Sequence, residues 1–389
     1  MSPLSNAMVP LKDADKGEMF YPLHAYVCKV CYLVQLGEFE TPEAIFAQDY
    51  TYFSSYSRSW IDHAKSYVSK MDKLLGFTND AHIVEVASND GYLLQWFIKL
   101  GRKVTGVEPA QNCAQAAIKA GVPTICEFFG VETARAISAD RGKADLLVAN
   151  NVLAHVPNLQ DFVGGFQEIL NPDGVITFEF PHLLNLIRYR QFDTIYHEHF
   201  SYLSLSPVKR VLENHGLRVF DVEELQTHGG SLRVFACKEN AMHAVTPAVE
   251  NLISREKDAG LYDTSVYSRL TGEVEDIKCN SLDFLIKARR EGKSVAAYGA
   301  AAKGTTFLNY CGIGPELIEF AVDRNPVKQN QFMPGVRIPV YTVEYLLDRN
   351  PDYVVILPWN LTAEVAGQLR KDGLTSSIVT FIPELVQHS

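Results

Sequence analysis

Long apolar runs are missing from this chain of 389 residues: no stretch approaches the roughly 20 uncharged apolar residues that a membrane-spanning helix needs. No basic segment followed by an apolar core stands near the first residue, so we expect no signal peptide and no membrane partner. Basic residues are not in excess either, because the formal net charge is −10, which argues against a nucleic-acid partner. The seven cysteines are odd in number and mostly scattered, which favours a reducing cytoplasm over a disulfide framework.

The composition that remains is that of a globular protein, with 47% hydrophobic and 21% charged residues. A chain of this length exceeds one ordinary core, so we expect several domains. Residues 1–75 are rich in Tyr and Ser, and residues 76–240 alternate short apolar runs with helical patterns, which predicts a parallel sheet. A charged helical stretch opens residues 241–389, and a second series of strands and helices follows it from Ser294.

A turn of small and acidic residues follows the first predicted strand of the middle region. The strand carries Glu85, and the turn is Ala87-Ser88-Asn89-Asp90-Gly91, whose small side chains let a ligand approach the backbone closely. Carboxylates here suit S-adenosylmethionine, which carries a sulfonium and an ammonium, better than they suit a pyrophosphate. We therefore predict that this turn binds a methyl donor.

Two later strands end in polar residues that fit the same ligand. Glu108 ends the second strand, where a carboxylate can accept hydrogen bonds from both ribose hydroxyls. Asn150 and Asn151 end the third strand and can line the pocket. Any one of these segments fits an ordinary strand–helix unit equally well. Three in this order and spacing resemble the class I methyltransferases, in which the loop after the first strand holds the donor.

A cluster of Tyr196, His197, Glu198 and His199 lies beyond the fourth predicted strand. An imidazole has the pKa needed to remove a proton next to a ketone, and a Tyr, a second His or a backbone amide can stabilise the resulting enolate. A metal site and a structural cluster of buried hydrogen bonds are the alternatives, although two ligands on one segment do not complete a metal site. The local sequence does not choose between His197 and His199 as the base.

Four motifs together resemble the sugar C-methyltransferases of deoxysugar biosynthesis, which act on dTDP-linked 4-keto hexoses. In chain order the motifs are Ser88-Asn89-Asp90-Gly91, Tyr196-His197-Glu198-His199-Phe200-Ser201-Tyr202-Leu203-Ser204, Gly229-Gly230-Ser231-Leu232-Arg233 and Tyr298-Gly299-Ala300-Ala301-Ala302-Lys303-Gly304. The resemblance covers about residues 20–365. It implies that His199 is the base, that Tyr196 and Glu198 are its partners, and that His155 and Tyr50 line the sugar pocket.

The front and back regions hold further candidates for substrate binding. The aromatic and hydroxyl-rich run at residues 49–60 can stack on a sugar or base and bind phosphate, or it can simply be a packing segment. The resemblance implies that this run closes over the sugar nucleotide and that the back domain helps to hold the diphosphate. A back domain that only packs is the alternative, since the loop at Lys303 has neither Walker A nor complete GxGxxG spacing. The predicted substrate contacts are Tyr52, Ser55, Ser57, Arg58, His182, Lys303 and Asp323.

Cys28 and Cys31 form half of a zinc knuckle. The family that the chain resembles has an earlier Cys pair, whereas no Cys precedes Cys28 here. Two thiolates do not make a closed structural site, so zinc is doubtful and we predict no metal ligands, with Cys28 and Cys31 as the candidates if a zinc is present.

We predict an α/β protein with a class I Rossmann-like methyltransferase domain, a small N-terminal domain and a Rossmann-like C-terminal domain, as a monomer or small homo-oligomer. The predicted function is S-adenosylmethionine-dependent methylation of a carbon of a dTDP-linked 4-keto deoxysugar. The competing hypotheses are an NADPH-dependent nucleotide-sugar reductase, a non-catalytic sugar-nucleotide-binding module and a sugar O-methyltransferase. The sequence leaves open whether C-3 or C-5 is methylated.

Overall fold

The computed structural model describes residues 1–46, 50 and 53–388, and the chain forms two compact units. Unit 1 consists of Met1–Val27, Leu183–His199 and Asp263–Ser389, and unit 2 consists of Cys28–His182 and Phe200–Tyr262. The boundaries expected at residues 75 and 240 do not coincide with these, because the first 27 residues group with the C-terminal part of the chain. Tyr52, one of the predicted substrate contacts, lies outside the described residues.

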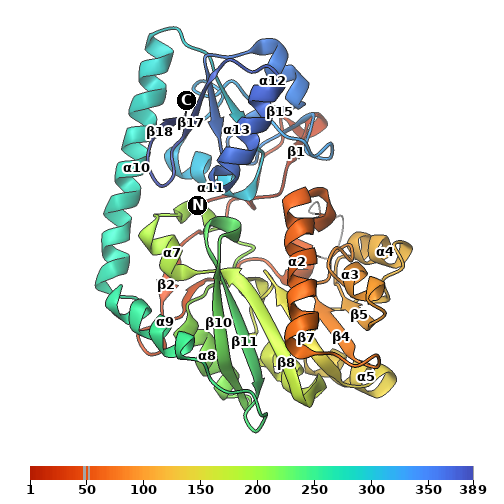
Figure 1. Ribbon diagram of the computed structural model, residues 1–389. Coiled ribbons are helices and arrows are strands. Elements are labelled where there is room, and N and C mark those ends of the chain that lie inside the picture. The colour runs from red at the N-terminus through yellow and green to blue at the C-terminus, as the bar shows by residue number, and fades with distance from the viewer. Residues whose placement is uncertain (47–49, 51–52, 389) are drawn as a thin grey trace. The chain divides into compact units, whose positions relative to one another are not determined.

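A seven-stranded sheet forms the centre of unit 2 (Figure 1). Its strands are β4 (His82–Val86), β5 (Lys103–Val107), β6 (Thr124–Ile125), β7 (Ala144–Asn150), β8 (Leu170–Pro181), β10 (Leu217–Leu225) and β11 (Ser231–Lys238). Their spatial order is β10-β11-β8-β7-β4-β5-β6; β11 is antiparallel to both of its neighbours, and the other pairings are parallel. Since β4 lies between β5 and β7, the winding of the chain reverses at β4, and open α/β sheets bind ligands at the carboxyl end of such a strand.

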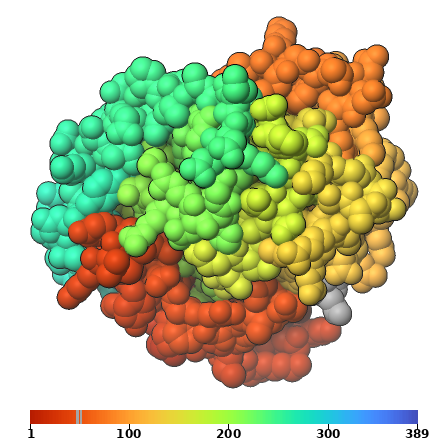
Figure 2. Space-filling view, turned by 90° about the horizontal axis from the view of Figure 1, so that it is seen from below, coloured from red at the N-terminus to blue at the C-terminus, as the bar shows by residue number. Residues whose placement is uncertain are grey.

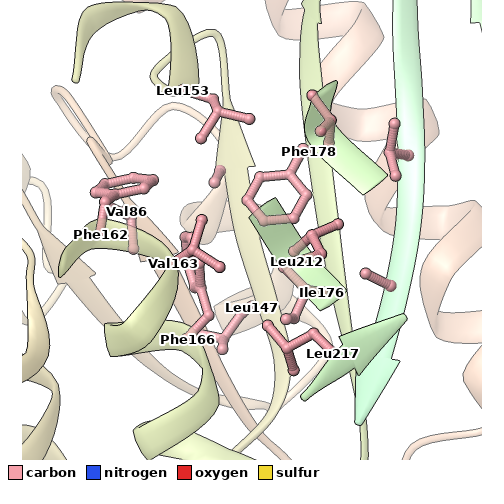
Figure 3. Packing of buried hydrophobic residues seen from close by; sticks show 14 of the residues in the cluster. Val86, Leu147, Leu153, Phe162, Val163, Phe166, Ile176, Phe178, Leu212 and Leu217 are labelled. Atoms are coloured by element: carbon pink, nitrogen blue, oxygen red, sulfur yellow. The ribbon is translucent and has the colours of Figure 1, made fainter. Parts of the chain in front are cut away.

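Helices cover both faces of this sheet. Those of unit 2 are α1 (Pro42–Phe46), α2 (Arg58–Leu75), α3 (Leu94–Lys99), α4 (Gln111–Lys119), α5 (Val131–Arg141), α6 (Leu159–Ile169), α8 (Leu205–Glu213) and α9 (Pro247–Asp258). Successive strand residues point to opposite faces. Ile83 and Leu146 therefore pack in the cluster that contains α2 and α3, whereas Val84 and Leu147 pack in the cluster that contains α5 and α6. Figure 3 shows Leu147 beside Phe166 of α6 in the second cluster.

The outer faces of α5 and α6 are open to solvent, where they appear in yellow in Figure 2. An exposed ion pair joins Arg135 of α5 to Glu168 of α6 at 2.8 Å. Such surface pairs contribute at most about 1 kcal/mol. The packing of these helices therefore depends on the apolar cluster beneath them.

A short antiparallel pairing joins β3 (Val34–Leu36) to β9 (Ser201–Tyr202) within unit 2. In the sequence, β2 (Ala25–Val27) is the last element before unit 2 begins at Cys28. After residues 183–199, which belong to unit 1, the chain returns to unit 2 at Phe200, and β9 then pairs with residues far earlier in the chain.

Unit 1 contains an eight-stranded sheet in the order β1-β14-β15-β13-β12-β16-β17-β18. These strands are β1 (Val9–Pro10), β12 (Val295–Tyr298), β13 (Phe320–Val322), β14 (Gln331–Phe332), β15 (Pro339–Tyr341), β16 (Tyr353–Ile356), β17 (Ser377–Thr380) and β18 (Val386–His388). The helices of this unit are α7 (Leu183–Arg188), α10 (Ser265–Arg290), α11 (Ala302–Cys311), α12 (Val343–Arg349) and α13 (Thr362–Lys371). The five central strands from β15 to β17 are parallel, and the winding reverses at β12, which confirms a second Rossmann-like sheet.

The N-terminal residues are part of this second sheet. Strand β1 pairs with β14 in antiparallel register, with Val9 opposite Phe332. Glu18 accepts a hydrogen bond from the Gly335 amide at 2.8 Å and pairs with the Arg337 guanidinium. Within the part of the chain that the structure describes, no helix combines the length and the apolar character needed to cross a membrane.

Candidate active site

The turn after β4 has an unusual backbone. Ala87 has φ 56°, Asn89 has φ 50° and Gly91 has φ 79°, so three of five consecutive residues are in the left-handed region. A Cβ on Gly91 would stand 2.7 Å from a side-chain carbon of Val122, so glycine is the residue that fits there. Left-handed backbone costs a non-glycine residue roughly 1–2 kcal/mol, and such strain persists where the surrounding structure fixes it, often at ligand sites.

Glu108 is one of the groups that fix this turn. It stands directly after β5, and its carboxylate accepts hydrogen bonds from the Asn89 amide at 2.9 Å and from the Ala110 amide at 2.8 Å. Burial raises the pKa of Glu108 to about 7, and the two amides act in the opposite direction. The structure thus brings the predicted ribose contact to the predicted donor turn.

Several carboxyl groups are concentrated around Glu85, near the end of β4. Burial raises the Glu85 pKa well above its ordinary value; a hydrogen bond with Tyr92 lowers it, and Asp90, Glu108 and Glu179 raise it further. A cation beside these carboxylates would stabilise their ionised forms. The ammonium and sulfonium of S-adenosylmethionine supply that charge.

Several polar atoms at the same edge of the sheet have no protein partner. Among the described residues, both side-chain polar atoms of Asn150, Oδ1 of Asn151 and Oδ1 of Asp90 are buried without a hydrogen bond. Asn151 has φ 53°, and its amide donates to the carbonyl of Glu179 at 2.6 Å. Buried polar groups are nearly always satisfied, so these atoms point to a polar ligand. The residues present therefore fit S-adenosylmethionine, with Glu108 and the two asparagines available to bind it.

The front segment contacts the donor turn directly. The Ser54 amide donates to Oδ1 of Asn89 at 2.9 Å, and the Ser55 amide donates to Oδ2 of Asp90 at 3.2 Å. Asn112 donates to the carbonyl of Tyr50 at 2.9 Å. The fold therefore brings two predicted groups together: Ser54 and Ser55 of the aromatic and hydroxyl-rich segment contact the predicted donor turn.

Other candidates of this segment have different surroundings. Ser57 is the N-cap of α2, where its hydroxyl accepts a hydrogen bond from the Trp60 amide at 3.3 Å, and Arg58 is exposed on the first turn. The ring of Phe46 lies 5.6 Å from that of Tyr50 and 5.5 Å from that of His155. Tyr50 and His155, both expected to line the sugar pocket, therefore share an aromatic neighbour.

Glu179 and Arg233 form a buried ion pair at the same end of the sheet. Arg233, from the Gly-Gly-Ser-Leu-Arg motif, donates through Nε to Glu179 at 2.8 Å, and His63 of α2 bonds the other carboxylate oxygen at 2.9 Å. Burial opposes ionisation of Glu179, but His63 and Arg233 outweigh it and lower the pKa. This motif therefore holds β11 to β8 beside the donor turn.

The Tyr-His-Glu-His cluster belongs to unit 1, and its two histidines differ in their hydrogen bonds. Nδ1 of His199 lies 3.0 Å from the carbonyl oxygen of Thr194, so this nitrogen carries the proton and the neutral ring has its lone pair on Nε2. The Tyr196 ring lies over His199, with the centroids 4.1 Å apart. His197 instead donates from Nε2 to the carbonyl of Pro22 at 3.1 Å, and its Nδ1 is buried without a partner.

The electrostatic surroundings of the cluster differ as well. Burial lowers the pKa of His197, while the bond to Pro22 acts against that change. Burial raises the pKa of Glu198; Asn6 donates to this carboxylate at 2.6 Å, and both Asn6 and Lys328 oppose the rise. His197 and Glu198 thus make hydrogen bonds to the N-terminal segment, whereas the bond from His199 to Thr194 stays within its own loop.

The back-domain candidates Lys303 and Asp323 lie at the carboxyl ends of the parallel strands of unit 1. Asp323 accepts hydrogen bonds from the Ala300 amide and the Asn325 amide, both at 2.8 Å, so it fixes the loop after β12. Lys303 donates to Asn360 at 3.0 Å, and burial lowers its pKa.

Asp193 was not predicted from the sequence, although it lies beside Lys303. It accepts a hydrogen bond from the Trp359 indole at 2.7 Å, while Lys303 lies 4.5 Å from the centre of that ring. Burial raises the Asp193 pKa to about 6, and Lys303 opposes the rise. No local motif marks Asp193, because its partners lie more than 100 residues away along the chain.

His182, predicted to contact substrate, is buried in unit 2 with its Nε2 2.7 Å from Glu256. Cys28 and Cys31 border a pocket of about 270 Å³ lined mainly by apolar residues. Hydrogen bonds from the Cys31 and Val30 backbone hold the pKa of Cys28 below its ordinary value. Among the described residues, no third His, Cys, Asp or Glu joins these thiols.

Family profiles match three successive parts of the chain. They are described as "Putative zinc binding domain" at residues 1–46, "Methyltransferase domain" at residues 60–222 and "C-methyltransferase C-terminal domain" at residues 226–383. Together with the acidic turn at the reversal point of the sheet, they define a class I, S-adenosylmethionine-dependent methyltransferase.

Similarity to curated proteins identifies the family within this class of methyltransferases. C-methyltransferase NovU of Streptomyces niveus is 36% identical over 364 residues, which are 94% of this chain and 86% of that protein. The chain therefore belongs to the C-methyltransferase family that includes NovU, which confirms the resemblance found in the motifs. Ubiquinone biosynthesis O-methyltransferase of Pasteurella multocida is 30% identical over 109 residues, covering 25% of this chain and 44% of that protein.

Solved structures with a similar fold cover about half of the chain. Magnesium protoporphyrin IX methyltransferase from Synechocystis, with S-adenosylhomocysteine bound, has a TM-score of 0.37 at 12% identity and covers 46% of this chain and 83% of its own. The PH0226 protein from Pyrococcus horikoshii has a TM-score of 0.40 at 14% identity and covers 51% of this chain and 99% of its own.

Proposed function

We propose that this C-methyltransferase methylates a ring carbon next to the ketone of a dTDP-linked 4-keto deoxysugar, with His199 as the base. The observation that carries the proposal is the hydrogen bond from His199 Nδ1 to the Thr194 carbonyl. This bond leaves Nε2 as the proton acceptor of the neutral ring, which is what abstraction of an α-proton requires. The motifs around His199 support the sugar substrate.

The reaction divides between proton removal and methyl transfer. Nε2 of His199 takes the proton from the α-carbon, and the electron pair of that C–H bond passes into an enolate. When bound, S-adenosylmethionine supplies the methyl group as an electrophile on a positively charged sulfur. The α-carbon forms the new bond, and the electron pair of the sulfur–methyl bond returns to sulfur. The products are the C-methylated sugar nucleotide, S-adenosylhomocysteine and a proton on His199.

The remaining candidates are assigned as binding and orienting groups. Tyr196 and Glu198 are proposed as partners of His199, and Tyr50 and His155 as lining of the sugar pocket. The residues proposed to contact the sugar nucleotide are Tyr52, Ser55, Ser57, Arg58, Lys303 and Asp323. A cytoplasmic location is proposed on the scattered, odd number of cysteines.

The experiment is a methyl-transfer assay with isotopically labelled S-adenosylmethionine and a dTDP-linked 4-keto-6-deoxyhexose. We expect a product whose label lies in a methyl group on a ring carbon by nuclear magnetic resonance. A methyl group on oxygen would indicate O-methylation instead. Calorimetric binding of NADPH with no binding of S-adenosylhomocysteine would contradict the proposal and favour a reductase.

A further inference from the structure

The carboxylate of Glu256, in α9, is enclosed in unit 2 and has several hydrogen-bond partners. One oxygen lies 2.7 Å from Nε2 of His182 and accepts from the Leu205 amide at 2.7 Å. The other accepts from the Tyr262 hydroxyl at 2.6 Å and from the Ser206 amide at 3.4 Å. Glu256 and the His182 side chain are both 0% exposed. A carboxylate this deeply buried persists only when its partners satisfy it.

The partners of Glu256 stand at the places where the chain leaves and re-enters unit 2. His182 is the last residue of unit 2 before residues 183–199, which belong to unit 1. Leu205 follows shortly after the chain returns at Phe200, and Tyr262 is the last residue before the final segment of unit 1. One carboxylate therefore binds residues on both sides of the segment that carries Tyr196, Glu198 and His199.

Holding the two ends of a segment together has an entropic cost that grows with the length of the segment. The backbone supplies part of the restraint, since His182 forms a bridge with Leu203 and its amide donates to the Gly230 carbonyl at 3.1 Å. Glu256 adds bonds to a side chain at one end and to the first amides of α8 at the other. Ser204, the N-cap of α8, makes no side-chain cap, so Glu256 supplies acceptors for this helix start.

We propose that Glu256 is a positioning residue that fixes the residues on either side of 183–199 and so sets the position of the base. This inference rests on the proposed role of His199. It also assigns His182 a positioning role rather than a contact with substrate.

The test is Glu256→Gln, which keeps the shape of the side chain but places an NH₂ group where an oxygen accepted hydrogen bonds. Hydrogen–deuterium exchange should show the amides of residues 183–205 exchanging about tenfold faster, with those of residues 83–108 unchanged. At saturating donor and dTDP-linked 4-keto-6-deoxyhexose, kcat should fall about tenfold or more. The calorimetric Kd of S-adenosylhomocysteine should stay within about twofold, because Glu256 makes its hydrogen bonds to His182, Leu205, Ser206 and Tyr262 rather than to the donor turn.

Two controls separate positioning from general stability. Glu224→Gln removes an equal charge from the exposed pair between Glu224 and Arg255, next to Glu256 in the sequence, and should change neither readout. His182→Leu should lower kcat without changing the Kd of dTDP.

Unchanged amide exchange at residues 183–205 in Glu256→Gln would overturn the inference. Faster exchange throughout unit 2, with loss of S-adenosylhomocysteine binding, would also overturn it, because the residue would then be only structural. If the unaltered protein transfers no methyl group, the proposed function fails while amide exchange still tests whether Glu256 fixes the segment.

Discussion

Replacing His199 with Asn tests the proposed base most directly. An Asn side chain can present an N–H close to the position of Nδ1, so the bond to the Thr194 carbonyl, worth about 1 kcal/mol, can be kept. The substitution removes Nε2, which is the proposed proton acceptor. A positioned acid–base group accelerates a reaction by about 10²–10⁴, or about 3–5 kcal/mol of barrier. We therefore expect turnover to fall by that factor while the fold and both ligand affinities remain.

A second assay isolates proton removal from methyl transfer. Exchange of the sugar's α-hydrogen with deuterated water, followed by nuclear magnetic resonance without methyl donor, should fall in parallel with turnover. His197→Asn is the matched control and should have the smaller effect, because Nε2 of His197 is bound to Pro22 and its Nδ1 is enclosed. Exchange at the normal rate in His199→Asn would show that the base lies elsewhere. Loss of exchange in His197→Asn alone would show that the other imidazole is the base.

Four further results are expected. Glu108→Ala should weaken S-adenosylhomocysteine binding by roughly 1–3 kcal/mol and leave dTDP affinity unchanged, and calorimetry showing equal losses of both would point to misfolding. Gly91→Ala should lower the free energy of unfolding by about 1–3 kcal/mol more than Gly76→Ala does. Both glycines have positive φ, but only at Gly91 would an added Cβ clash with a neighbour. Equal effects of the two substitutions on thermal denaturation would contradict this reasoning. Burial raises the pKa of Asp193 to about 6, so the contribution of its protonated form to stability is present below pH 4 and is lost as the pH rises through 6. The free energy of unfolding of Asp193→Asn should therefore rise relative to the parent by up to about 3 kcal/mol between pH 4 and pH 7.5. A difference between the two proteins that does not change with pH would refute this. Elemental analysis should find less than one zinc per chain, since Cys28–Cys31 supply two thiolates, and one zinc per chain retained through dialysis against a chelator would contradict this.

The proximity of the candidate donor-binding residues could be predicted from the sequence, because these residues follow neighbouring parallel strands. Turns after β4, β5 and β7 meet at one edge of the sheet once the order of these strands is set, so Asn89 and Glu108 come within hydrogen-bond distance. The strained φ angles of Ala87 and Asn89 could not be read from residue types, since neither residue requires the left-handed region.

The contacts of the Tyr196–His199 cluster in unit 1 could not be predicted from local sequence patterns. The cluster at Tyr196–His199 could be recognised as unusual, but its partners Asn6 and Pro22 lie more than 170 residues earlier. Pairings over such distances depend on which segments share a core, and periodicity within a window carries no information about that. For the same reason, the sequence alone does not distinguish Glu256 from the other charged residues of its helical region, because its hydrogen-bond partners are distant in the chain.

The pairing of β1 with β14 has a consequence for the order in which the protein can fold during synthesis. Glu18 and Gly335, which are hydrogen-bonded, are 317 positions apart, so the first residues must wait for partners that do not yet exist. At about 5–20 residues per second, that interval is roughly 15–60 s on the ribosome. Unit 2 is complete at Tyr262 and can fold in that time, whereas unit 1 closes only after the strands from β12 to β18 have been made. An N-terminal fusion partner or a chaperone bound to the nascent first segment would therefore delay unit 1 selectively.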